Sequence, residues 1–73
     1  MSMTRDPRID PEPGDIVVAT VGGVVVRRKV LAALSVTEDV RFMDSRFMFG
    51  RFGSLLSWRK WCKKNKAEVE TVR

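Results

Sequence analysis

The fold is decided by residues 16–31, which read IVVATVGGVVVRRKVL. Two runs rich in β-branched residues flank a Gly-Gly pair, and β-branched side chains fit the pleated surface of a strand. Both glycines can adopt positive φ without steric cost, as a two-residue hairpin turn requires. The stretch therefore predicts a β-hairpin with strands at 16–21 and 24–31, and we extend the second strand through 32–34.

The returning strand contains three consecutive cations, Arg27, Arg28 and Lys29. Alternate side chains of a strand point to opposite faces, so Arg28 falls on the same inward face as Val26 and Val30. An unpaired charge is costly to bury. We therefore expect a bulge or a bend in the strand near the triplet.

More strands follow the hairpin. Residues 37–39 are polar and predict a loop, after which 40–43 predicts a third strand. Asp44-Ser45 predicts a turn, and 46–52 a fourth strand rich in aromatic residues. The alternating tail at 67–73 predicts an edge strand, whose charges discourage further pairing.

Residues 54–65 predict an amphipathic helix. Ser54 follows Gly53 at the position of an N-cap, where its hydroxyl can accept a backbone N–H. At 100° per residue, one arc of this helix collects apolar side chains and the opposing side collects cations. The apolar arc contains Leu55, Trp58, Trp61 and Cys62, and the cationic side contains Arg59, Lys60, Lys63 and Lys64.

The aromatic residues predict the core. A domain this small has few other large side chains, so we expect Trp58, Trp61 and at least three of the four phenylalanines to be buried. The phenylalanines are Phe42, Phe47, Phe49 and Phe52. Because Arg41, Arg46 and Arg51 lie between them, an exposed platform for stacking nucleic-acid bases is the alternative.

Residues 1–13 hold all three prolines among alternating charges, which predicts an extended arm with Ile9 as its lone apolar anchor. The remaining residues, 14–73, form one small domain. The fold class expected is mainly β (α+β): a curled antiparallel sheet or SH3-like barrel of four or five strands, with one helix before the last strand. An open meander packed on the helix is the alternative.

The amino-acid composition argues against a catalytic function. The 73 residues include no histidine and one cysteine, Cys62, so neither an intramolecular disulfide nor a zinc site is expected. Nucleophilic mechanisms usually need an imidazole base. We therefore expect no catalytic residues, no metal and no cofactor. With no apolar run long enough to span a bilayer and no signal peptide, a cytoplasmic protein without a membrane partner is expected.

Charge is concentrated in the middle of the chain. The formal net charge is +5, but residues 27–66 alone carry eleven basic and three acidic side chains. Such asymmetry creates a local positive field that suits a polyanion, nucleic acid above all. The same charges would also serve as an ordinary solvated surface. The candidate nucleic-acid-binding residues are Arg27, Arg28, Lys29, Arg59, Lys60, Lys63 and Lys64.

Three short motifs resemble the pattern of a group of small uncharacterised bacteriophage and prophage proteins. They are Asp6-Pro7-Arg8, Pro13-Gly14-Asp15 and the segment SLLSWRKW at 54–61. The resemblance implies a phage origin and a compact SH3-like barrel, and it transfers no active residues. The function expected is a non-catalytic basic module that engages nucleic acid or a nucleoprotein machine. The alternatives are a protein-protein inhibitor or adaptor, or a minor structural component of the virion.

Overall fold

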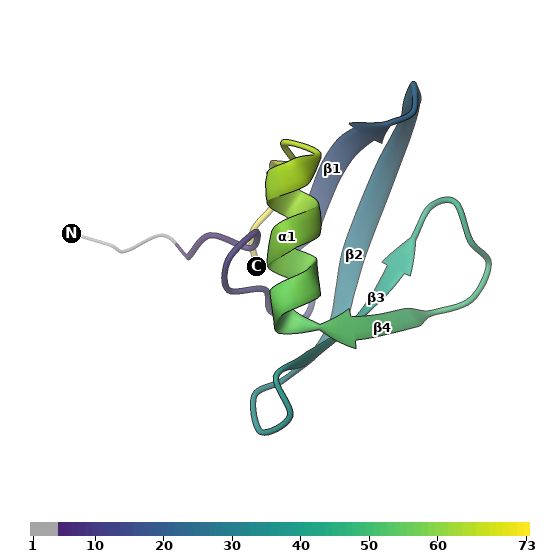
Figure 1. Cartoon of the computed structure of the whole chain (residues 1–73). Helices are drawn as coiled ribbons and strands as arrows, with labels where there is room; N and C mark the ends of the chain where they lie inside the picture. The colour runs from purple at the N-terminus through teal and green to yellow at the C-terminus, as the bar shows by residue number, and fades with distance from the viewer. Residues whose placement is uncertain (1–4) are drawn as a thin grey trace.

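The computed structural model describes residues 5–73, which form a five-stranded sheet and one helix (Figure 1). The strands are antiparallel, in the order β4-β3-β2-β1-β5. In chain order the elements are β1 (Ile16–Val21), β2 (Val24–Leu34), β3 (Asp39–Asp44), β4 (Arg51–Ser54), α1 (Leu55–Lys64) and β5 (Glu68–Thr71). The mainly β fold with one helix before the last strand is confirmed.

The β1–β2 hairpin forms as predicted. Gly22 and Gly23 both have positive φ, 56° and 81°, which turns the chain in two residues and pairs Val21 with Val24. The extension of the second strand through Leu34 is also confirmed.

The bulge lies beyond the basic triplet. The β2–β3 register shifts between Val30 and Ala32, whereas the pairing of Arg28 with Val17 on one side and Asp44 on the other is regular. The strand therefore does not bend to turn Arg28 away. Its side chain stays on the inward face, where Asp44 neutralises it.

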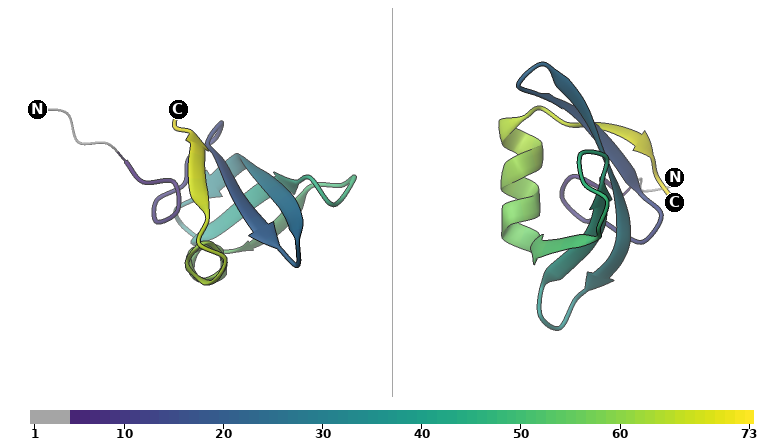
Figure 2. Two further views of the ribbon diagram at one scale, coloured as in Figure 1. Left: turned by 90° about the horizontal axis from the view of Figure 1, so that it is seen from above. Right: turned by 90° about the vertical axis from the view of Figure 1, so that its right-hand side faces the viewer.

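The helix covers the inward face of the sheet, as both views of Figure 2 show. The Ser54 hydroxyl accepts the N–H of Ser57 at 3.1 Å, so the predicted N-cap is confirmed. At the other end, Lys66 adopts a left-handed conformation with φ 51°, and Ala67 N–H donates to the Cys62 carbonyl. This turn ends the helix and leads the chain into β5, the predicted edge strand.

The core lies between helix and sheet. Trp58 and Cys62 are buried against small side chains of the strands, and the Trp58 ring meets Phe42 edge-on with centroids 5.3 Å apart. The other core residues are Val17, Ala19, Val30, Val40 and Ala67, with Val21, Leu55 and Trp61 partly buried around them. The predicted packing of the apolar arc of α1 is confirmed.

The sheet is curled but does not close into a barrel, because β4 and β5 stand at opposite ends of the strand order. In Figure 2 the helix lies across one face of this curved sheet. The predicted curled antiparallel sheet is therefore confirmed, whereas a closed SH3-like barrel is not formed.

The prediction for 46–52 is wrong in two respects. Residues 46–50 lie outside the ladder, and β4 begins only at Arg51. Of the four phenylalanines, Phe42 alone is buried, with 6% of its surface exposed. The cause is local: the carboxylate of Asp44 accepts the backbone N–H of Arg46, and this turn carries the chain out of the sheet.

The arm is not extended over the part that the structure describes. It turns at residues 6–10, where the carbonyl of Asp6 accepts the N–H groups of Ile9 and Asp10. Pro7 is buried and its carbonyl accepts Trp58 Nε1–H at 2.9 Å, whereas Ile9 is 54% exposed. Pro7, not Ile9, therefore anchors the arm. Residues 1–4 of the predicted arm lie outside the described residues.

Candidate nucleic-acid interface

The outward side of α1 forms the helix-back surface, defined by Arg59, Lys60, Lys63 and Lys64. All four side chains are exposed, and within residues 5–73 none makes an ion pair with a carboxylate. Arg59 is partly engaged, because its Nε donates to the Ile9 carbonyl at 2.7 Å. Lys63 and Lys64 lie in the last turn, where cations interact favourably with the helix dipole. The predicted cationic side of the helix is therefore brought together in space.

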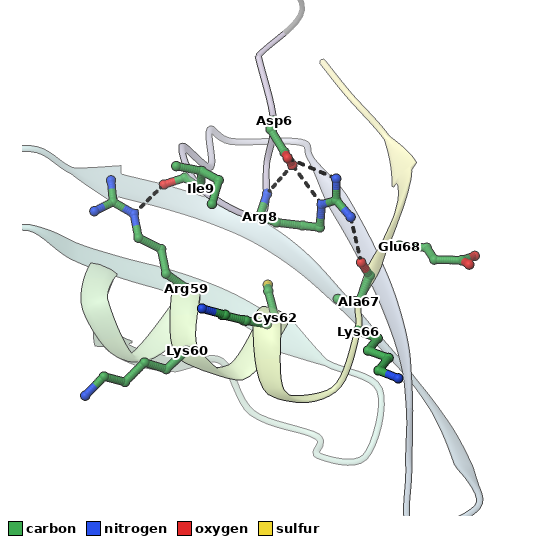
Figure 3. Close-up of a pocket in the computed structure, with 10 residues that line it drawn as sticks. Asp6, Arg8, Ile9, Arg59, Lys60, Cys62, Lys66, Ala67 and Glu68 are labelled. Carbon is green, nitrogen blue, oxygen red and sulfur yellow. Dashed lines mark hydrogen bonds and ion pairs between the residues drawn. The ribbon is translucent and has the colours of Figure 1, made fainter.

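A groove separates the arm from α1 and runs beside this surface (Figure 3). It encloses about 600 Å³, and its apolar lining includes Ile9, Cys62 and Ala67. Lys60 and Lys66 extend away from the groove in opposite directions, and Arg8 is held by Asp6 and by the Ala67 carbonyl. Cations that diverge do not surround one compact anion. They suit a ligand whose negative charges are spaced along a chain.

The basic triplet of β2 does not form a second cationic surface. Arg27 makes a two-pronged contact with Glu70, with Nη2 at 2.7 Å from Oε1, across the intervening strand β1. This carboxylate raises the pKa of Arg27, first through the hydrogen bond and then through its charge. Lys29 alone of the three remains exposed without an ion pair in the described part of the chain.

Arg28 is a structural residue rather than a binding one. Its side chain is 11% exposed, and its guanidinium lies 3.8 Å from the ring centroid of Trp61 and 4.4 Å from that of Phe42. Burial lowers the pKa of Arg28, and the Asp44 carboxylate, 3.0 Å from Nε, opposes this. The prediction that Arg28 faces a phosphate is therefore wrong.

Asp44 holds this cluster together. Burial opposes its ionisation, but hydrogen bonds from the side chain and N–H of Arg46 and from Arg28 outweigh burial and keep the pKa of Asp44 well below its usual range. The carbonyl of Asp44 also accepts the N–H of Phe47 at 2.9 Å. The start of the β3–β4 loop is thereby fixed to the sheet.

The same loop presents a second surface, which sequence reasoning assigned to the core. We define the Phe-Arg surface by Arg41, Met48, Phe49 and Phe52. Phe49 and Phe52 are 80% and 76% exposed, and Met48 is 89% exposed. The loop projects from the sheet on the side away from α1 (Figure 1). The sequence signal for this surface was the repeated Arg-Phe pair at 41/42, 46/47 and 51/52, which fits neither strand nor helix periodicity.

Chemistry at the one thiol is disfavoured by its surroundings. Cys62 is buried, and burial raises the pKa of its thiol to about 11 despite the nearby charges of Arg28 and Arg8. Thiolates, not thiols, are nucleophiles and metal ligands. Within residues 5–73 no group of three or more histidine, cysteine or acidic side chains is placed to hold a metal ion.

Across the same residues, no helix has both the length and the apolar character needed to cross a membrane. Comparison with protein-family models, with curated proteins and with solved structures gives no match.

Proposed function

We propose that this protein is a non-catalytic nucleic-acid-binding module that uses the helix-back surface to contact the phosphate backbone. The observation that carries the proposal is the imbalance of uncompensated charge. Nine of the fourteen cations make no ion pair with a carboxylate in residues 5–73, and four of these nine belong to the helix-back surface.

The placement of the acidic residues supports the same function. Five of the nine carboxylates are already paired with arginines, and the two buried ones, Asp15 and Asp44, are among them. Ion pairs therefore remove much of the negative field, while the cations of α1 keep theirs. A phage origin, implied by the motifs at 6–8, 13–15 and 54–61, is part of this proposal and fits a small accessory protein of a nucleoprotein machine.

The test is the salt dependence of binding. Fluorescence anisotropy with a labelled DNA duplex is expected to give an affinity whose logarithm falls linearly with the logarithm of salt concentration. Lys60→Gln and Lys63→Gln should each reduce the slope by about one, because each removes one phosphate contact. Lys29→Gln removes the same charge from the opposite face of the sheet and is the matched control, with an unchanged slope.

Two outcomes would contradict the proposal. One is the absence of duplex binding even in dilute buffer. The other is equal loss of slope in all three variants, which would mean that net charge rather than the helix-back surface is responsible. Capture of a stoichiometric protein complex that survives nuclease, without oligonucleotide binding, would favour the alternative of a protein inhibitor or adaptor.

A further inference from the structure

The Phe-Arg surface makes no contribution to the core of this domain. Every residue from Ser45 to Phe52 is exposed, and three of the large apolar side chains among them, Met48, Phe49 and Phe52, have more than three quarters of their surface in solvent. Contiguous exposed apolar groups on a small domain mark a binding surface. The apolar character alone does not specify what binds there.

The arginines around this surface indicate which kind of ligand it binds. Arg51 places its guanidinium 4.3 Å from the Phe47 ring centroid, and Arg46 places its own at 5.3 Å. On the outer face of the sheet, Arg41 is directly opposite Phe52 in the β3–β4 ladder. Arg46 and Arg51 therefore both lie against the Phe47 ring, and Arg41 is the cation beside Phe52 on the outer face of the sheet.

No free negative charge interrupts this arrangement. Residues 45–52 contain no acidic side chain, and the preceding Asp44 is buried and neutralised by two arginines. Arg41 and Arg51 make no ion pair with a carboxylate within the described residues. The surface is thus complementary to a ligand that is both anionic and aromatic. Two copies of this chain would instead bring their arginines together, which disfavours self-association through it.

The surface is also held in place before any ligand arrives. Asp44 fixes Arg46 and Phe47 through backbone and side-chain hydrogen bonds, and β4 pairs Arg51 and Phe52 with β3. Both ends of the loop are therefore anchored, and less conformational entropy is lost when a ligand binds.

We infer that the Phe-Arg surface binds the unstacked bases of single-stranded nucleic acid, with Phe49 and Phe52 as the stacking residues and Arg41, which neighbours Phe52 on the outer face, at the phosphates. The inference rests on the proposed function and adds a substrate class to it. Bases in a duplex are already stacked and cannot lie on the rings, whereas single strands offer every base as a π face.

The experiment compares three labelled oligonucleotides of equal length, about twelve nucleotides. They are a thymidine single strand, the corresponding duplex and an abasic single strand, which keeps the phosphates and lacks the bases. The single strand is expected to bind more tightly than the abasic strand. Phe49→Ala and Phe52→Ala should each weaken thymidine-strand binding by about tenfold. They should leave abasic-strand and duplex binding unchanged.

Val36→Ala is the matched control, because Val36 is 95% exposed in the β2–β3 loop and lies outside both the Phe-Arg surface and the helix-back surface. Equal binding of thymidine and abasic strands, with no effect of the phenylalanine variants, would overturn the inference and leave duplex binding by the helix-back surface intact. Absence of binding to all three oligonucleotides would overturn both.

Two further measurements test the other occupants of this surface. Sedimentation velocity that shows a dimer dissolved by Phe49→Ala would overturn the inference in favour of a second copy. Flotation with phosphatidylserine vesicles that is abolished by the same variant, without a preference for the thymidine strand, would overturn it in favour of a membrane surface.

Discussion

The inward face of the sheet and the region of the β3–β4 loop use large apolar side chains in opposite ways. On the inward face, α1 and the arm cover the sheet, Trp58 and Pro7 are buried, and the Trp58 N–H donates to the Pro7 carbonyl. In the β3–β4 loop and on the outer face of β4, Phe49 and Phe52 are exposed to solvent. The difference teaches that the large apolar side chains that hold this fold are separate from those that it exposes to solvent.

The largest loss of folding stability is expected when Trp58 is truncated. Trp58→Ala should lower the free energy of unfolding by about 3 to 5 kcal/mol, because it leaves a cavity under Phe42 and removes the hydrogen bond to Pro7. Phe49→Ala should change it by less than about 0.5 kcal/mol. Urea unfolding followed by tryptophan fluorescence for the phenylalanine variant, and by far-UV circular dichroism for both, measures the difference. Similar losses in the two variants would contradict the separation.

A smaller loss is expected from Asp44→Asn, which removes the carboxylate shared by Arg28 and Arg46 at the base of the loop. The change leaves Arg28 mostly buried without a counter-charge and should cost roughly 2 to 3 kcal/mol at neutral pH. Asp39→Asn, at the start of the same strand, is the control, because Asp39 makes no ion pair within residues 5–73.

The pH dependence sharpens the same prediction. The pKa of Asp44 is lower in the folded protein than in the unfolded chain, so its contribution is present above the unfolded pKa and is lost as the pH falls below about 4. Asp15 has a lowered pKa as well and should act in the same direction. The urea midpoint of the original protein should therefore fall on acidification, and that of Asp44→Asn should fall less. Parallel curves would show that Asp44 does not contribute.

The smallest effect is expected in the rate at which a reagent modifies Cys62. Because burial raises the pKa of the Cys62 thiol to about 11, iodoacetamide should modify it slowly in the native state and quickly in urea. Mass spectrometry after timed quenching measures both rates. Rapid modification of the native protein would mean that Cys62 is accessible from the groove, and would contradict the view that the inward face is covered.

Local signals predicted much of the fold. The Gly22-Gly23 turn, the Ser54 cap and the apolar arc of α1 depend on neighbouring residues, and all three are found. The burial of the phenylalanines depended instead on how many large side chains the inward face accepts. Trp58, Phe42 and the guanidinium of Arg28 fill that space, so Phe47, Phe49 and Phe52 remain outside.

For the candidate site, too, the sequence predicted what depends on neighbouring residues and missed what depends on distant ones. The cations of α1 share one side of a helix, a property of periodicity alone, and the structure keeps them exposed. The ion pairs of Arg27 and Arg28 depend on strand register, because their partners, Glu70 and Asp44, lie on strands distant in sequence. Periodicity within one strand carries no information about the charge that stands across from it.

The contacts around Asp15 have a practical consequence. Its carboxylate binds the guanidinium of Arg5 and accepts the backbone N–H of Arg73, and Arg5 Nη2 donates to the Arg73 carbonyl at 2.9 Å. The two ends of the described chain therefore emerge side by side, on the opposite side of the molecule from the β3–β4 loop (Figure 1). A tether or tag attached at Arg73 would therefore leave the domain beside Arg5, and immobilisation through it would orient the exposed phenylalanines of the β3–β4 loop toward the solution.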